Sequence, residues 1–167
     1  MRRTLWRCLV GLLVLGLSAA LQAQSLQFYT EEYPPLNYSR DGRPVGLAVD
    51  LVRELFERTG DHGRISVVPW ARGYEMIQKY PDVVLFQMSR SAEREKMFNW
   101  VGPVHESIYG FYSRADSKIA LSSLEEAKKV RSIGVYRGDI RHQMLTEAGF
   151  ANLVVSNENS VNIVQLM

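Results

Sequence analysis

Apolar residues alternate with polar ones or recur at fixed spacings, and these patterns predict strands and helices. Residues 26–30 alternate in this way, which is typical of a strand with one buried face. Residues 47–59 place apolar side chains at helical spacing and are followed by a glycine, a common helix stop. A strand is expected to begin at Ile65 and to end at Pro69-Trp70, and a short helix, closed by a proline, is expected over 72–80. Four consecutive apolar residues in 82–87 favour a parallel strand covered on both faces, which completes an α/β layer with right-handed crossovers.

A polar break separates this first half from a second α/β stretch. Residues 98–112 are expected to be extended, with a bend at Gly102-Pro103, and residues 113–118 are polar. The pattern then restarts with two strands and the helix between them, over residues 131–136, 139–148 and 152–156. The fold class is therefore α/β in both halves of the chain.

Turn and capping residues mark the other boundaries. Residues 31–46 are predicted to be a loop, because prolines and an Asp-Gly pair break regular structure. Ser122, with Glu125 three residues later, predicts a capping box. Ser160 is expected to cap a last helix that runs to Met167. A helix that short at a chain end is marginal, so we expect the second α/β unit to be truncated.

The opening segment has the pattern of a secretory signal peptide. Residues 1–8 are basic, and residues 9–20 are apolar and uncharged. Cleavage is expected after Ala23, with Ala20 as the alternative. An uncleaved anchor is disfavoured, because spanning a bilayer takes about 20 apolar residues. We therefore expect residues 1–23 to be removed and the mature protein to be periplasmic.

Charge argues against one class of function. The chain has 20 Lys and Arg against 18 Asp and Glu. Three of the arginines lie in the first 23 residues, so the mature chain would carry 17 basic and 18 acidic residues. A nucleic-acid binder usually has a larger, clustered basic excess, so no nucleic acid is expected among the partners. The only cysteine, Cys8, also lies in the opening segment, which excludes disulfide chemistry from the mature chain.

Four segments follow one another in a recognisable order: FYTEEYPPLNYSRDGRPVGLAVDLVRELFERTG, VVPWARGY, VVLFQMSRSAEREKMFNWVGPV and VRSIGVYRGD. Together they resemble the family-3 extracellular solute-binding proteins of bacterial ABC importers, a group best known for polar amino acids. The resemblance implies a two-lobed periplasmic-binding-protein fold, with a largely complete first lobe over 24–112 and a partial second lobe over 113–167. It also implies that hinge closure traps a small polar ligand between the lobes. The protein would then be a monomer without enzyme activity or cofactor, and its partner an inner-membrane ABC permease.

The segment MSRSAERE, residues 88–95, matches the family's two hydroxyl residues followed by an arginine. By that resemblance, Arg94 pairs with a carboxylate of the ligand, and Ser89 and Ser91 add hydrogen bonds. The chemistry is suitable, because a guanidinium is a planar fork that binds a carboxylate through two charge-assisted hydrogen bonds. Strand ends are also where open α/β sheets bind ligands. The alternative is that Arg94 belongs to a solvated run of charges.

Residues near other strand ends are further ligand-binding candidates. Tyr33 stands where the family places an aromatic ring over the ligand; alternatively, it packs beneath its loop. Trp70 is either a second platform for the ligand or a core residue, and Arg72 is a second candidate anion contact. Asp139 departs from the hydroxyl residues that the family often has there. It would repel a carboxylate or, alternatively, cap its helix.

Two other functions use the same scaffold and stay open as alternatives. A dehydratase-like periplasmic enzyme would need a general acid in the cleft, for which Glu31, Glu32 and Glu106 are the candidates. A ligand-sensing module would report to a signalling partner instead of a permease. The histidines lack metal-ligand spacing, and phosphate-binding and nucleophile-elbow motifs are missing, so neither metal ligands nor catalytic residues are predicted.

Overall fold

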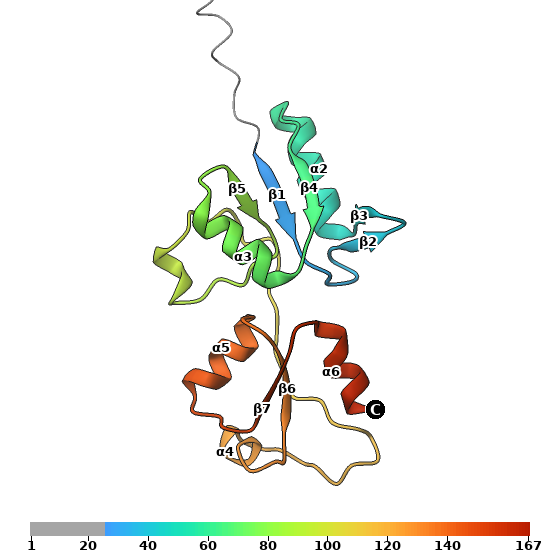
Figure 1. Ribbon diagram of the computed structural model, residues 1–167, viewed down its shortest axis with the longest axis vertical. Helices are drawn as coiled ribbons and strands as arrows, with labels where there is room; N and C mark the ends of the chain where they lie inside the picture. Colours follow the sequence, from blue (N-terminus) through green and yellow to red (C-terminus); the bar gives the residue numbers. More distant parts are fainter. Residues whose placement is uncertain (1–25) are drawn as a thin grey trace, which may run out of the picture.

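A three-stranded parallel sheet forms the centre of the first lobe (Figure 1). The computed structural model describes residues 26–167, so the signal-peptide prediction for residues 1–23 lies outside the described residues. Strand β1 (Gln27–Thr30) lies between β4 (Arg64–Val67) and β5 (Val83–Leu85), and both neighbours run parallel to it. The parallel strand expected from the apolar run is thereby confirmed.

Helices α2 (Leu47–Thr59) and α3 (Trp70–Lys79) connect these strands. Gly60 ends α2 in the left-handed conformation, with φ of 74°, as its position predicted. The helix packs on the sheet through Phe56, whose ring meets that of Phe28 edge-on at 4.7 Å. The leucines at the same helical spacing are exposed instead: Leu47, Leu51 and Leu55.

The segment predicted as a loop, residues 31–46, contains a hairpin, and in this respect the prediction is wrong. Strands β2 (Tyr38–Arg40) and β3 (Arg43–Val45) pair in antiparallel orientation. Asp41 and Gly42 join them with φ of 51° and 72°, the two-residue turn that an Asp-Gly pair favours. Strands of three residues are too short to give a clear alternation of apolar and polar positions, so the hairpin was missed.

The second lobe is built on a two-stranded parallel sheet. Strand β6 (Ile133–Tyr136) pairs with β7 (Leu153–Ser156) in parallel. Its helices are α4 (Leu124–Ala127), α5 (Ile140–Glu147) and α6 (Asn159–Leu166). Figure 1 shows α5 and α6 on opposite sides of the strands. The predicted order of elements is confirmed in this half as well.

Two predicted helix caps are displaced. Ser123, not Ser122, caps α4 by accepting a hydrogen bond from the N–H of Glu126 at 3.2 Å. The Glu126 carboxylate in turn accepts one from the N–H of Ser122 at 2.7 Å. Two adjacent serines and two adjacent glutamates occur here, so the pattern fits both registers. At α6 the cap position belongs to Glu158 instead of Ser160.

An irregular stretch joins the two lobes. After the short 3-10 helix η2 (Arg94–Lys96), residues 97–123 contain neither helix nor strand, in agreement with the predicted break. The Gly102-Pro103 peptide bond, where a bend was predicted, is cis. The exact lobe boundary at residue 112 stays a prediction. Within the described part of the chain, every helix is too short or too polar to cross a membrane.

Candidate functional site

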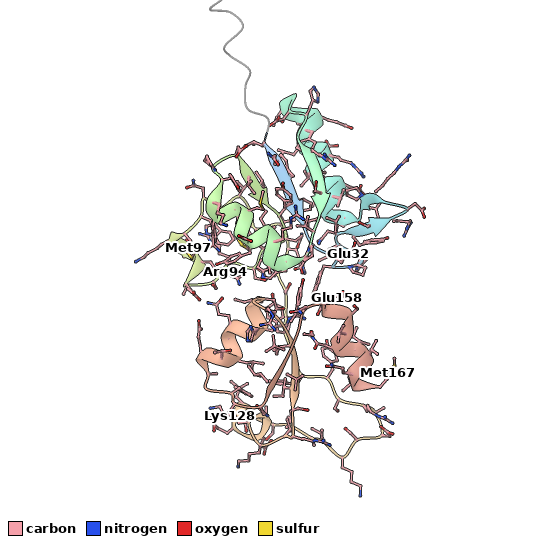
Figure 2. The ribbon with its side chains drawn as sticks, in the orientation of Figure 1. Glu32, Arg94, Met97, Lys128, Glu158 and Met167 are labelled. Atoms are coloured by element: carbon pink, nitrogen blue, oxygen red, sulfur yellow. The ribbon has the colours of Figure 1, made fainter. Side chains whose placement is uncertain are left out.

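The carboxyl ends of the strands in the two lobes face each other across a narrow boundary (Figure 1). Tyr136, the last residue of β6, contacts Trp70, which follows β4 and begins α3. Figure 2 shows Arg94 and Glu32 on the edge of the first lobe that faces Glu158 on the second. Open α/β sheets bind ligands at such strand ends, so this boundary is the candidate site.

Arg94 is buried at this boundary, with 2% of its surface exposed. The central carbon of its guanidinium lies 5.2 Å from the ring centre of Trp70 and 5.1 Å from that of Tyr74. Nη1 donates a hydrogen bond to the Ser89 carbonyl at 3.3 Å. The aromatic faces attract the cation and fix its orientation. The alternative of a solvated Arg94 is therefore wrong.

One backbone carbonyl of the second lobe binds both Arg94 and Trp70. The Gly138 oxygen accepts hydrogen bonds from Arg94 Nη2 at 3.2 Å and from Trp70 Nε1 at 2.8 Å. Both donors belong to the first lobe, so these bonds cross the boundary. Arg94 Nε is buried and has no hydrogen-bond partner among residues 26–167. In the guanidinium of Arg94, Nε is thus an unpaired donor, and Nη2 donates to a neutral carbonyl oxygen.

The two predicted serines lie beside Arg94. Ser91 Oγ accepts a hydrogen bond from the Arg94 backbone N–H at 3.3 Å. The Ser89 hydroxyl is hydrogen-bonded to the Tyr109 hydroxyl at 2.8 Å. The structure therefore brings together the three residues that the motif predicted. Contact of these hydroxyls with a ligand stays a prediction.

The other three predicted ligand-binding residues are in different environments. Tyr33 is partly buried in the loop after β1. Trp70 is 4% exposed and belongs to a core cluster with Leu85 and Tyr136, so its alternative as a core residue is confirmed. Arg72 is exposed and lies two positions after Trp70 in α3. Side chains two positions apart on a helix point to different faces, so Arg72 does not share the buried face of Trp70. The structure does not bring Arg72 to the site.

Glu31 follows β1 directly and is partly buried near second-lobe residues. Burial, and then repulsion by the Asp139 carboxylate, raise the pKa of Glu31 from its ordinary value of 4.5 to about 7. Attraction by Arg141 and a hydrogen bond with Tyr136 act in the opposite direction on this pKa. Such a carboxyl exchanges its proton near neutral pH. The sequence suggested Glu31 only as one of three acids, since burial between lobes leaves no local signal.

Asp139 caps its helix, which was one of the two alternatives for this residue. Its carboxylate accepts a hydrogen bond from the N–H of His142 at 2.9 Å and forms an ion pair with Arg141. The charge of Asp139 is therefore compensated within the second lobe.

Tyr136 is a site residue that the sequence analysis missed. Its hydroxyl accepts a hydrogen bond from the Trp70 backbone N–H at 3.0 Å. Tyr136 also lowers the pKa of Glu31, although burial and Asp139 outweigh this effect. The one available signal was a tyrosine ending an apolar strand, because a buried tyrosine hydroxyl usually needs a polar partner.

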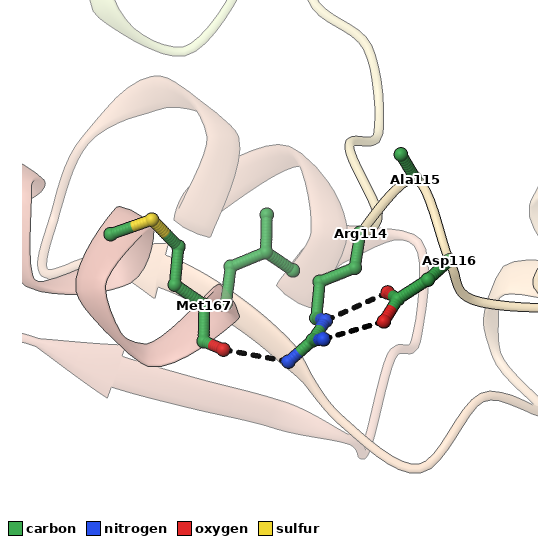
Figure 3. A pocket seen from close by; sticks show the side chains of 5 residues that line it. Arg114, Ala115, Asp116 and Met167 are labelled. Atoms are coloured by element: carbon green, nitrogen blue, oxygen red, sulfur yellow. Dashed lines mark hydrogen bonds and ion pairs between the residues drawn. The ribbon is translucent and has the colours of Figure 1, made fainter.

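A hollow of about 430 Å³ lies away from the boundary, beside the end of α6 (Figure 3). Arg114 lines it and donates to the Asp116 carboxylate at 2.8 and 2.6 Å and to the Met167 carbonyl at 2.7 Å. All three guanidinium nitrogens are thus engaged, which makes this hollow a poor anion site. Residues 26–167 contain no cluster of three or more metal-ligating side chains.

The fold and the boundary together define a two-lobed α/β protein with its candidate site between the lobes. The chain belongs to the bacterial extracellular solute-binding proteins, family 3, which match it over residues 27–163. The resemblance noted in the sequence is thereby confirmed.

Three relatives show how far the similarity extends. The octopine-binding periplasmic protein of Rhizobium meliloti is 30% identical over 113 residues, which cover 66% of this chain and 38% of that protein. A histidine kinase sensor domain with similarity to periplasmic binding proteins has a TM-score of 0.77 at 24% identity, covering 86% of this chain and 63% of that chain. An ancestral amino-acid-binding protein, a precursor of cyclohexadienyl dehydratase, has a TM-score of 0.75 at 18% identity, covering 90% and 69%. The chain spans less than two thirds of the first two.

Proposed function

We propose that this chain is a periplasmic solute-binding protein that captures a small, amino-acid-like ligand bearing a carboxylate. Closure of the two lobes would trap the ligand, and an ABC permease in the inner membrane would receive it. The observation that carries the proposal is Arg94, whose buried guanidinium lies at the lobe boundary and binds the Gly138 carbonyl at 3.2 Å.

The chemistry of Arg94 supports a carboxylate as the ligand group. A carboxylate accepts stronger, charge-assisted hydrogen bonds from a guanidinium than a neutral carbonyl does. A ligand carboxylate would therefore compete with the Gly138 carbonyl for Nη2 and engage the unpaired Nε. We assign further ligand contacts to Ser89, Ser91 and Tyr33, and a supporting role beneath the guanidinium to Trp70. Arg72 is the weakest of the predicted contacts, because it is exposed.

The relatives support the ligand class. One binds octopine and another is named for amino acids, and both ligand types carry carboxylates. Because the chain spans only part of each relative, the ligand itself is part of the proposal.

Isothermal titration calorimetry with the twenty L-amino acids and octopine tests this function. We expect at least one to bind, and Arg94→Lys to weaken its binding about 10- to 100-fold, because lysine keeps the charge but lacks the planar fork. Arg90→Lys is the matched control, since Arg90 is a surface residue paired with Glu95 at 2.6 Å. Equal affinities of Arg94→Lys and wild type would refute the site, and absence of binding throughout would refute the ligand class.

A dehydratase-like enzyme remains the second candidate because of Glu31. A carboxyl with a pKa of about 7 at a lobe boundary is suited to act as a general acid near neutral pH. Dehydration of a cyclohexadienol creates an aromatic ring, so ultraviolet absorbance would report turnover of such a substrate. Turnover that disappears in Glu31→Gln would favour the enzyme, whereas binding without turnover favours transport.

A further inference from the structure

Two aromatic rings on one helix support the Arg94 guanidinium. Trp70 and Tyr74 lie four residues apart on α3, so their side chains share one face of the helix. Their rings stack with centres 5.5 Å apart and planes at 23°. The central carbon of the guanidinium lies 5.2 Å from the ring centre of Trp70 and 5.1 Å from that of Tyr74. The two rings therefore form a platform for the cation, and each ring attracts it.

Tyr74 is itself held in place by neighbours in the first lobe. The ring of Phe98 meets that of Tyr74 edge-on, with centres 5.9 Å apart and an interplanar angle of 70°. The Tyr74 hydroxyl donates to the sulfur of Met97 at 4.0 Å, a weak hydrogen bond. Trp70 also donates hydrogen bonds to second-lobe residues, whereas these contacts of Tyr74 lie within the first lobe. The support from Tyr74 therefore does not depend on contact between the lobes.

The first lobe leaves one edge of the guanidinium open. Nη1 of Arg94 donates to the Ser89 carbonyl at 3.3 Å. Nη2 donates to the Gly138 carbonyl of the second lobe, and Nε has no hydrogen-bond partner among residues 26–167. Nε and Nη2 form one side of the planar fork, and their parallel N–H groups match the two oxygens of a carboxylate. The orientation of the guanidinium thus decides whether both oxygens can be bound at once.

We propose that Tyr74 is a positioning residue, which together with Trp70 holds the Arg94 guanidinium so that Nε and Nη2 are presented together to a ligand carboxylate. Tyr74 acts through Arg94 and needs no contact with the ligand. Its role in binding rests on the function proposed above, whereas the orientation of Arg94 can be measured without ligand.

Nuclear magnetic resonance of the full chain reports this orientation through the Nε–H signal of Arg94, which Arg94→Lys identifies by removing it. A proton held over aromatic rings is shifted upfield, so we expect this signal upfield of those of exposed arginines. Tyr74→Leu should move the signal downfield because one ring is lost, and Tyr74→Phe should leave it in place because the ring is kept. Tyr80→Leu is the matched control, since Tyr80 is 49% exposed at the end of α3.

Calorimetry with the twenty L-amino acids and octopine tests the consequence for binding. Tyr74→Leu should weaken the binding of any compound that wild type binds about tenfold, and Tyr74→Phe should retain the affinity, because only the first variant loses a ring beside the cation. Circular dichroism checks that each variant is folded. If Tyr74→Leu unfolds, Tyr74→Met takes its place, because methionine also lacks a ring and fills a similar space.

Three results would overturn the proposal: an Arg94 signal that stays in place in Tyr74→Leu, one that moves as far in Tyr74→Phe, or an unchanged affinity of Tyr74→Leu. If no compound binds wild type, the proposed function fails, and the Arg94 signal alone then decides whether Tyr74 orients the guanidinium.

Discussion

Replacing Glu31 by glutamine should change how the stability of the protein depends on pH. In the folded state the Glu31 carboxyl keeps its proton up to about pH 7, against 4.5 for the ordinary carboxyl of an unfolded chain. Between these two values the folded state binds one more proton than the unfolded state. The free energy of unfolding therefore falls as pH rises through this window.

The size of the effect follows from the shift in pKa. A change from 4.5 to about 7 corresponds to about 3 kcal/mol, since one pKa unit equals about 1.4 kcal/mol. Below the window, protonated Glu31 is neutral like glutamine, so wild type and Glu31→Gln should be similarly stable. Above it, the variant should be more stable by up to about 3 kcal/mol, because it has no charge to bury.

Urea unfolding, followed by far-ultraviolet circular dichroism between about pH 4 and pH 8, measures this difference. The control is Glu57→Gln, because Glu57 is an exposed glutamate on α2. The difference between that control and wild type should not vary with pH. A gain for Glu31→Gln of less than about 1 kcal/mol at the upper end would show that Glu31 is solvated and refute its placement between the lobes.

Two further changes test the helix cap and the core, both by urea unfolding. Asp139→Ala should destabilise the protein by about 1 kcal/mol through loss of the α5 cap, and Asp139→Asn should cost less because asparagine also caps. Equal losses for both variants would mean that the ion pair dominates. Phe28→Ala should lower the free energy of unfolding by about 3–5 kcal/mol, because Phe28 is 4% exposed and packs against Phe56. Leu51→Ala should change it by no more than about 0.5 kcal/mol, because Leu51 is exposed. Similar costs for the two would contradict the assigned buried face of α2.

Local patterns predicted the elements well where they were long or ended by a distinctive residue. The helix before Gly60 and the apolar strand β5 illustrate this, because helical spacing buries one face of a helix and a continuous apolar run buries both faces of a strand. The hairpin β2–β3 was missed because its strands have three residues each. The cap of α4 lies at Ser123 instead of Ser122 because adjacent serines and glutamates satisfy the same pattern. The cap position of α6 belongs to Glu158, whose side chain makes no capping hydrogen bond.

The candidate site was predictable only in part. The motif identified Ser89, Ser91 and Arg94 as a group, and these residues lie together at the end of β5. Arg72 shared a segment with Trp70 but is exposed, since helix geometry separates positions two apart. The raised pKa of Glu31 depends on Asp139, more than a hundred positions away along the chain, and the hydroxyl of Tyr136 binds the N–H of Trp70, 66 positions away.

The sequence by itself determined the family, the α/β order of elements and the segment that carries the anion-binding candidates. Each of these follows from the order and spacing of residues that are close together in the sequence. Only the tertiary structure decided that Arg94 is buried against two rings, that Gly138 binds it from the other lobe, and that Tyr136 caps α3. These contacts arise where the ends of distant strands meet, and the burial that sets their strength exists only once both lobes are packed together.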